Sequence, residues 1–145
     1  MNCGTKSSGT EFYSMKKYDN FCKSLANLQE GAKLEEPYSI VEQAGIAALF
    51  EICFEQSWKL MKELLEDHGR FQGKIGSPRV IIKIAHQCSM ISDCDGWLEL
   101  LETRNILSHT YSDEQALKAI RDIKASYLSL FQALKQEIDE NWLTE

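Results

Sequence analysis

The stretch "YSIVEQAGIAALFEICFEQSWKLMKELLEDH", Tyr38–His68, decides the fold. Its apolar residues recur every three or four positions, which is the spacing that places side chains on one face of an α-helix. Because two such stripes run along it, the segment is expected to pack on two sides as the central helix of a bundle, with Gly69 as its stop. The first stripe is Ile40, Ala44, Ala47, Phe54, Trp58, Met61 and Leu65, and the second is Ile46, Leu49, Cys53, Leu60 and Leu64.

The flanking segments show the same helical spacing. A first helix is predicted from Tyr18 to Ala32, and Pro37 suits the first turn of the helix that follows. Ser77 and Pro78 predict the cap and first residue of a short helix over 79–88, and the "SDCDG" turn precedes a helix that begins at Trp97. The last helix starts with a capping box formed by Ser112 and Gln115. Its stripe is Ala116, Ile120, Ile123, Tyr127, Leu130, Leu134 and Ile138.

These elements predict an all-α fold, because strand-like alternation is almost absent. Short connections favour antiparallel neighbours, so we expect an antiparallel up-and-down helical bundle of four main helices plus a short extra helix. The length of 145 residues suits one domain, over 15–145. Residues 1–14, rich in Ser, Thr and Gly, are interpreted as a disordered tail or a cloning remnant.

Composition excludes several classes of function. The net charge of −6 argues against a broad nonspecific nucleic-acid surface, although a local basic cleft is compatible with it. The five cysteines are odd in number and form no Cys-x-x-Cys pair, which disfavours a disulfide framework. The N-terminus lacks the apolar core of a signal peptide, and no apolar run reaches membrane-spanning length. A cytoplasmic protein is the simplest interpretation.

Polar residues concentrate where the fourth helix is expected to end, in "RNILSHTY", Arg104–Tyr111. At about 100° per residue, Arg104, Ser108 and Tyr111 share one face, and Asn105 and His109 form an adjacent pair. Leu101 and Leu107 can hold this helix against the bundle, and Glu99 and Glu102 lie close enough in sequence to neutralise the arginine.

The chemistry of this set is specific. A histidine can exchange a proton near neutral pH, and an arginine can bind a phosphate through two donors and stabilise its developing charge. With RNA, whose 2′-hydroxyl can attack the neighbouring phosphate, these two residues would suffice without a metal. The alternative from chemistry alone is that Arg, Asn and Ser only satisfy carbonyls at a helix end.

Two further sets of residues favour structure over function. The spacing of Cys88 and Cys94 is not that of a zinc site, so these cysteines and the nearby His86, Asp93 and Asp95 are not interpreted as metal ligands. Trp58 and Trp97 could line a base-stacking pocket, but both lie on apolar stripes, which favours packing.

The polar segment also resembles a known family. Arg104–Tyr111 matches the Arg-x4-His-x-Tyr motif of HEPN-domain proteins of the HepT type, and "FEICFEQSWKLMKELLEDHG", Phe50–Gly69, resembles their Phe-Glu-x3-Glu-x2-Trp-Lys helix. "SPRVIIKIAHQCSMISDCDGWLELLETRNILSHTY", from Ser77, continues the similarity, which covers roughly residues 17–140. The chain is identified as a member of the group named nucleotidyltransferase substrate-binding proteins.

This resemblance implies an up-and-down bundle, usually a homodimer, whose partner is a separately encoded minimal nucleotidyltransferase. The group is similar to the C-terminal helical domain of kanamycin nucleotidyltransferase. In HepT-type toxins the motif forms a metal-independent ribonuclease centre, which the partner neutralises by adding AMP to the tyrosine. Carried over, Arg104 would stabilise the phosphate, His109 would be the acid or base, Tyr111 would be the AMPylation acceptor, and Asn105 and Ser108 would orient them.

Three hypotheses follow. The chain is a noncatalytic substrate-binding subunit of a two-component nucleotidyltransferase system of toxin–antitoxin type, an endoribonuclease toxin held in check by that transferase, or a dimeric scaffold with a vestigial motif. The resemblance implies no cofactor or metal, and RNA or a nucleotide as substrate. The chain lacks the Gly-Ser motif with paired Asp residues of the transferase itself, so we expect no nucleotidyl transfer by this chain alone.

Overall fold

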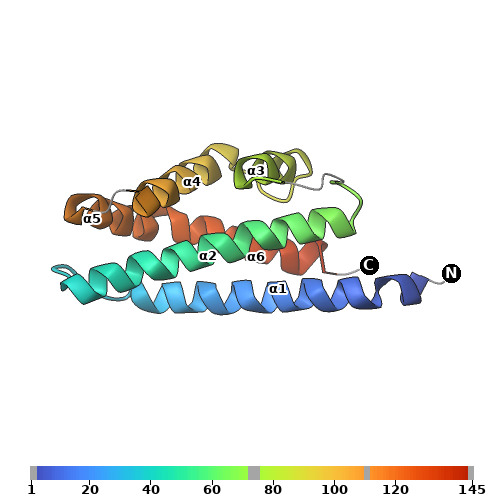
Figure 1. Cartoon of the computed structure of the whole chain (residues 1–145), viewed down its shortest axis with the longest axis horizontal. Coiled ribbons are helices and arrows are strands. Elements are labelled where there is room, and N and C mark those ends of the chain that lie inside the picture. The colour runs from blue at the N-terminus through green and yellow to red at the C-terminus, as the bar shows by residue number, and fades with distance from the viewer. Residues whose placement is uncertain (1–2, 72–75, 110–111, 144–145) are drawn as a thin grey trace.

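The computed structural model describes residues 3–71, 76–109 and 112–143, with side chains from Ser14 onward. In these ranges all regular structure is helical, and α1, α2, α4 and the continuous α5–η1–α6 helix run alternately up and down, with short α3 between α2 and α4 (Figure 1). The predicted all-α bundle of four main helices plus one short helix is therefore confirmed. The elements are α1 (Cys3–Gly31), α2 (Ile40–Asp67), α3 (Pro78–Gln87), α4 (Cys94–His109), α5 (Asp113–Asp122), the π-helical turn η1 (Ile123–Tyr127) and α6 (Leu128–Asn141).

Helix α1 extends into the segment that the sequence assigns to a tail, because it begins at Cys3. At Ser14, the last residue of that segment, the side chain is buried, and its hydroxyl donates a hydrogen bond to the Asp67 carboxylate of α2. The end of the segment thus packs on the bundle. Whether residues 1–14 belong to the native chain stays a prediction.

Helix α2 begins later than the sequence predicts, and local hydrogen bonds explain why. The Ser39 hydroxyl accepts from the backbone N–H of Glu42 at 3.0 Å, while the Glu42 carboxylate accepts from the Ser39 N–H at 2.9 Å. This capping box satisfies N–H groups that the first turn leaves unpaired, so the helix begins at Ile40 and Pro37 lies before it. The predicted stop is confirmed, because Gly69 has φ +69°, a conformation that glycine adopts without strain.

Helix α4 begins earlier than predicted, because "SDCDG" forms its first turn and not a separate loop. The Asp93 carboxylate accepts a hydrogen bond from the Gly96 N–H at 2.8 Å, which caps the helix before Cys94. A Cβ on Gly96 would lie 2.5 Å from a carboxylate oxygen of Asp93. A larger residue at position 96 would therefore require the Asp93 carboxylate to move.

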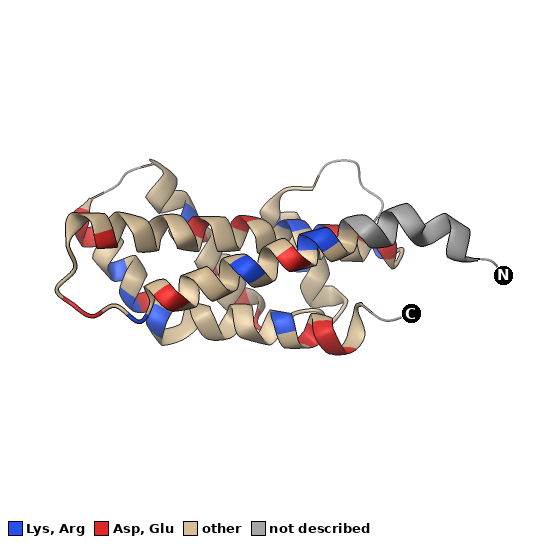
Figure 2. Ribbon diagram, turned by 90° about the horizontal axis from the view of Figure 1, so that it is seen from below, with Lys and Arg blue, Asp and Glu red and all other residues tan. Residues whose placement is uncertain are grey.

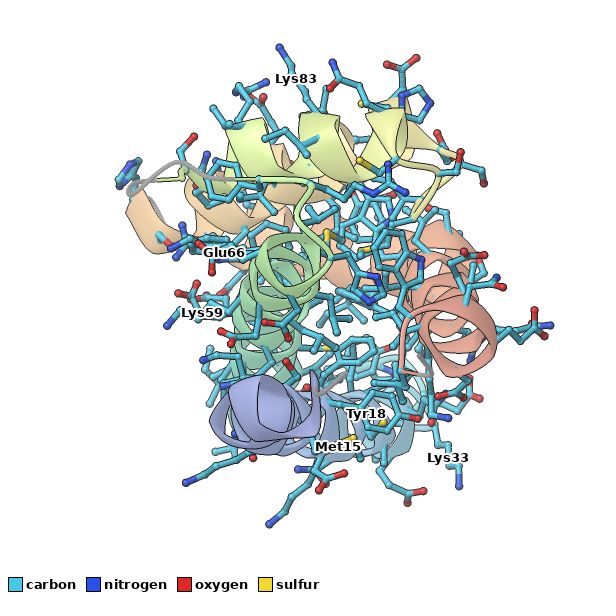
Figure 3. The ribbon with its side chains drawn as sticks, turned by 90° about the vertical axis from the view of Figure 1, so that its right-hand side faces the viewer. Met15, Tyr18, Lys33, Lys59, Glu66 and Lys83 are labelled. Atoms are coloured by element: carbon cyan, nitrogen blue, oxygen red, sulfur yellow. The ribbon has the colours of Figure 1, made fainter. Side chains whose placement is uncertain are left out.

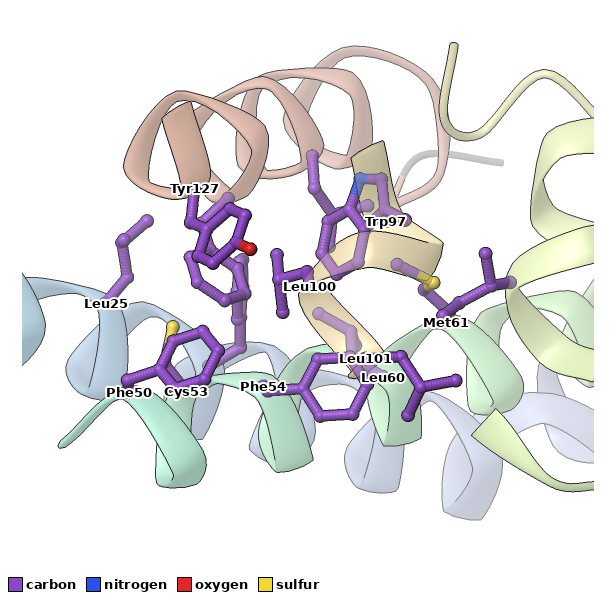
Figure 4. Close-up of a cluster of buried hydrophobic side chains, with 14 of the residues drawn as sticks. Leu25, Phe50, Cys53, Phe54, Leu60, Met61, Trp97, Leu100, Leu101 and Tyr127 are labelled. Atoms are coloured by element: carbon purple, nitrogen blue, oxygen red, sulfur yellow. The ribbon is translucent and has the colours of Figure 1, made fainter. Parts of the chain in front are cut away.

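Aromatic rings from all four main helices meet in the core, where Figure 4 labels Phe50 and Phe54 of α2 and Trp97 of α4. The Phe131 ring of α6 lies 5.4 Å from Trp97 of α4, 6.4 Å from Phe50 of α2 and 6.5 Å from Phe21 of α1. All four side chains are at least 99% buried. Since burying one such ring contributes roughly 1.5–3 kcal/mol, this cluster is a principal source of tertiary stability.

The π-helical turn η1 changes which residue of the last helix enters the core. In a regular α-helix Leu130, seven residues after Ile123, would share its face, as the sequence stripe predicts. In the wide turn over Ile123–Tyr127, the Leu128 N–H donates to the Ile123 carbonyl, five residues earlier. The turn holds about one residue more than an α-helical turn, so the residues after it face a different side of the helix. Phe131 is fully buried, whereas Leu130 is half-buried and packs against the edge of the core.

The predicted stripes of α2 are buried over most of its length. The exceptions lie in its first turns, where Ile40 is 63% exposed and Ala44 is also exposed. They lie on a side of α2 that the described helices leave uncovered. We name the exposed apolar row Val41, Ala44, Ala48 and Ile52 the α2 stripe, because these residues share one face.

The π turn makes a prediction for stability. Phe131→Ala is expected to destabilise the protein by about 3–5 kcal/mol, because it removes a ring from the core. Leu130→Ala is expected to cost about 1 kcal/mol, because that side chain is only half-buried. Urea unfolding followed by circular dichroism measures both. A larger loss for Leu130→Ala than for Phe131→Ala would contradict the burial described for these two side chains.

Candidate functional site

Residues 104–109 of the polar segment lie on the last two turns of α4, which the core holds in place. Leu101 and Leu107 are both buried, as the sequence predicts, so α4 is anchored on each side of Arg104. The Arg104 side chain is 31% exposed and extends across the surface toward α2. The site is therefore a surface cluster on two neighbouring helices.

Glu55 of α2 is the centre of this cluster. Its Oε1 accepts from Arg104 Nη2 at 3.1 Å and from Trp58 Nε1 at 3.3 Å, and its Oε2 lies 3.2 Å from Lys59 Nζ. The pair with Lys59 has the i,i+4 spacing, acid first, that favours an ion pair within a helix. The contact with Arg104 joins residues 49 positions apart in the chain.

The acidic partner of Arg104 differs from the sequence expectation. Glu99 and Glu102 on α4 are both exposed, and the carboxylate that binds the guanidinium comes from α2 instead. Side chains two or five positions from Arg104 on the same helix point to other sides, whereas Glu55 faces it across the α2–α4 contact.

The other predicted site residues differ in what they contact. The Asn105 amide oxygen accepts from Arg104 Nη1 at 3.3 Å, so this residue helps to orient the guanidinium. The Ser108 hydroxyl instead donates to the backbone carbonyl of Arg104 at 3.0 Å, which is a helix-internal bond. His109 is exposed and is the last residue of α4. The predicted acceptor Tyr111 lies outside the described residues.

A hydrogen bond ties α4 to the π turn one residue before Arg104. Thr103 Oγ1 and the Tyr127 hydroxyl lie 2.7 Å apart. Burial raises the pKa of Tyr127 above its usual value, so the hydroxyl keeps its proton at neutral pH. Neither residue was singled out for the site by sequence reasoning, because the pattern marks Tyr127 only as an apolar stripe position.

The segment after α4 is anchored at its far end. The Ser112 hydroxyl accepts from the Gln115 N–H at 3.1 Å, which confirms the predicted cap of α5. The Gln43 side chain of α2 donates to the carbonyl of Asp113 at 3.0 Å. The helices before and after residues 110 and 111 are thereby attached to α2, through Arg104 of α4 and through Asp113 of α5.

Comparison with protein families identifies the chain. The family model "Nucleotidyltransferase substrate binding protein like" matches residues 16–140, nearly the whole sequence. The chain belongs to this family. The match covers the second half of α1, nearly all of the chain that follows it, and the polar segment.

Individual members and structural neighbours agree with this assignment. The chain is 33% identical over 82 residues to "Probable ribonuclease HepT" of Haemophilus influenzae, and it spans about half of that relative, 56% of its length. A crystal structure of a Thermus thermophilus protein has a TM-score of 0.68 at 27% identity, covering 86% of this chain and 99% of that one.

A HEPN toxin of Shewanella oneidensis shares the fold. Its tri-AMPylated form, in complex with an MNT antitoxin, superposes with a TM-score of 0.73 at 14% identity. The similarity covers 88% of this chain and 97% of that one.

Other candidate residues of this family member have structural roles. Trp97 is buried in the core, as expected, and Trp58 packs half-buried against it. Burial raises the pKa of the Cys53 thiol to about 12, so it stays protonated and unreactive. In the described part of the chain, no three His, Cys, Asp or Glu side chains lie close enough to hold a metal ion, so the set around Cys88 and Cys94 forms no such site.

The remaining surface is mixed in charge. Acidic and basic residues alternate along α1 on the face shown in Figure 2. A pocket of about 270 Å³ lies between α6 and the α3–α4 connection, and none of its lining residues belongs to the Glu55–Arg104 cluster. Of the helices described, none is long and apolar enough to cross a membrane.

Proposed function

We propose that this chain is the helical substrate-binding and partner subunit of a separately encoded minimal nucleotidyltransferase, in a cytoplasmic two-component system of toxin–antitoxin type. The observation that carries the proposal is the family match over residues 16–140. The fold shared with a HEPN toxin that is bound to an MNT antitoxin supports it. The cysteines described as free thiols, at 22, 53, 88 and 94, fit a reducing compartment.

In this proposal Tyr111 is the AMPylation acceptor. Its phenolic oxygen would attack the α-phosphate of ATP, bound by the partner, and displace pyrophosphate. The residue follows the end of α4 by two positions, between His109 and the Ser112 cap. An AMP group there would add a negative charge close to Arg104 and His109 in sequence.

The first prediction of this proposal concerns the partner. Co-expression with the transferase encoded beside it is expected to yield a stable complex and, with ATP, a mass increase of one adenylyl group on this chain. Intact mass spectrometry of wild type beside Tyr111→Phe measures the modification. Complex formation without any adenylyl group would contradict the acceptor role, and absence of a complex would contradict the partner role.

A second candidate function is metal-independent RNA cleavage. The arrangement that favours it is an Arg104 guanidinium oriented by Glu55 and Asn105, with exposed His109 at the end of the same helix. The 2′-hydroxyl of RNA would attack the adjacent phosphate, His109 would transfer a proton, and Arg104 would stabilise the charge on the phosphate. The 33% identical relative named a probable ribonuclease supports this candidate.

RNA cleavage in EDTA tests the second function. Wild type is expected to cut structured RNA, while Arg104→Ala and His109→Ala each lose on the order of 10²-fold or more in rate, because each removes a group that acts on the transition state. Ser126→Ala is the matched control, since its hydroxyl likewise donates to a helix carbonyl, that of Asp122, and lies outside the polar segment. If wild-type protein without an adenylyl group cuts no RNA, the ribonuclease function is contradicted. The hypotheses of a noncatalytic subunit and of a scaffold then remain.

We also propose that the protein is a homodimer that uses the α2 stripe. Val41 is 76% exposed and Ile52 50%, an arrangement that a second copy would cover. The small side chains of Ala44 and Ala48 between them would let two helices approach closely. The α2 stripe ends at Ile52, one turn before Glu55. The polar cluster therefore lies next to the proposed interface along α2.

A charge in the stripe tests the dimer. Ile52→Glu is expected to give monomers in analytical ultracentrifugation, because a carboxylate would be buried at the interface without a partner. Val80→Glu on α3 is the matched control, since Val80 is similarly exposed but lies outside the stripe. A monomeric wild type, or an Ile52→Glu protein that stays dimeric, would contradict this interface.

A further inference from the structure

We propose that Lys59 is a second phosphodiester-binding cation of the site, and that Glu55 is the positioning residue that holds it beside Arg104. The ligand class is single-stranded RNA, with one phosphate at Arg104 and an adjacent phosphate at Lys59. This inference rests on the proposed action on RNA and extends the site from α4 onto α2.

The first argument is the geometry of the Glu55 carboxylate. One oxygen contacts Arg104 and the other contacts Lys59, at 3.1 and 3.2 Å. The Trp58 indole N–H donates to the first oxygen at 3.3 Å, and the Trp58 ring packs against the buried core. The Trp58 hydrogen bond thus holds the Glu55 carboxylate from the side of the core. Arg104 and Lys59 each contact a different oxygen of that carboxylate.

The second argument is the set of donors that stays available. Among the described residues, the Arg104 hydrogen bonds use two N–H groups of the five that a guanidinium carries. Lys59 carries three N–H donors on a side chain that is 47% exposed, and it points outward from α2 in Figure 3. Both cations can therefore bind a phosphate while they remain in contact with Glu55.

The third argument is charge. The two cations and one carboxylate leave a local charge of +1 (two positive, one negative) on a chain whose net charge is −6. Glu63, one turn after Lys59 on α2, and Glu102, two residues before Arg104 on α4, form no ion pair with either cation in the described ranges. Exposed ion pairs of this kind contribute about 0–1 kcal/mol to stability, so stability alone does not account for the arrangement.

The salt dependence of RNA binding tests the role of Lys59. The probe is fluorescein-labelled oligouridylate, and all proteins carry His109→Ala so that the RNA stays intact. Because each phosphate-binding cation releases counterions, Lys59→Ala is expected to lower the slope of log affinity against log salt by about 0.7. Lys59→Arg is expected to keep the original slope. A role in folding alone would not move this slope.

Lys83→Ala is the matched control. Lys83 is an exposed lysine of α3 that extends from the top of the molecule in Figure 3, away from Lys59, and its loss is expected to leave the slope unchanged. An equal slope for the Lys59→Ala protein and the protein that retains Lys59 would overturn the inference. An equal fall in the Lys83→Ala slope would also overturn it, because the effect would then be one of general charge.

Glu55→Gln tests the positioning role in the protein that retains His109. Both cations remain, so the slope for oligouridylate binding, measured in the His109→Ala background, is expected to stay unchanged. The kcat for RNA cleavage is expected to fall on the order of tenfold to 10²-fold with little change in KM, because Arg104 loses the carboxylate that holds it in place. An unchanged kcat would overturn the positioning role.

The outcomes separate this inference from the proposed function. Binding with the predicted slope change but without wild-type cleavage supports Lys59 and overturns both the ribonuclease function and the positioning role of Glu55. Cleavage that is insensitive to Lys59→Ala, with an unchanged slope, keeps the ribonuclease and overturns the inference. No binding of oligouridylate overturns the inference, while the transferase partnership is judged separately by complex formation.

Discussion

The contact of the Phe131 ring with Trp97, Phe50 and Phe21 is the constraint on which the rest of the structure depends. One side chain of α6 touches a ring from each of the other three main helices, so their relative positions are set around it. The π turn η1 decides that Phe131, and not Leu130, takes this place. The wide turn at η1 is thus followed directly by the residue that contacts all three of the other main helices.

The same packing determines the geometry of the polar cluster. Trp97 fixes the first turns of α4 against Phe131, and the Thr103–Tyr127 hydrogen bond fixes its later turns against η1. Arg104 follows Thr103 directly and lies beside Glu55 of α2, a residue 49 positions earlier in the chain. The packing of the apolar core brings these polar side chains together, so few contacts among the polar groups are needed to form the cluster.

Sequence patterns predicted the fold class, the helices and the position of the polar segment, because apolar spacing and caps such as Ser77 and Ser112 are local signals. They failed where a local bond outweighed the pattern, as at the Asp93 cap, and where η1 changed the helical period. The motif predicted Arg104 and His109 as candidates. It could not predict the Arg104–Glu55 contact, since that depends on which faces of α2 and α4 meet.

The bond between Thr103 and Tyr127 has a consequence for genetics. Because it joins the turn before Arg104 to the helix that carries Phe131, substitutions in α6 would alter the polar cluster without touching it. If the proposed action on RNA holds, a selection for variants that lose it would therefore recover residues of two kinds, those that contact the RNA and those that only hold α4 in place. Heat sensitivity would distinguish them, because variants of the second kind would lose activity most strongly near their melting temperature.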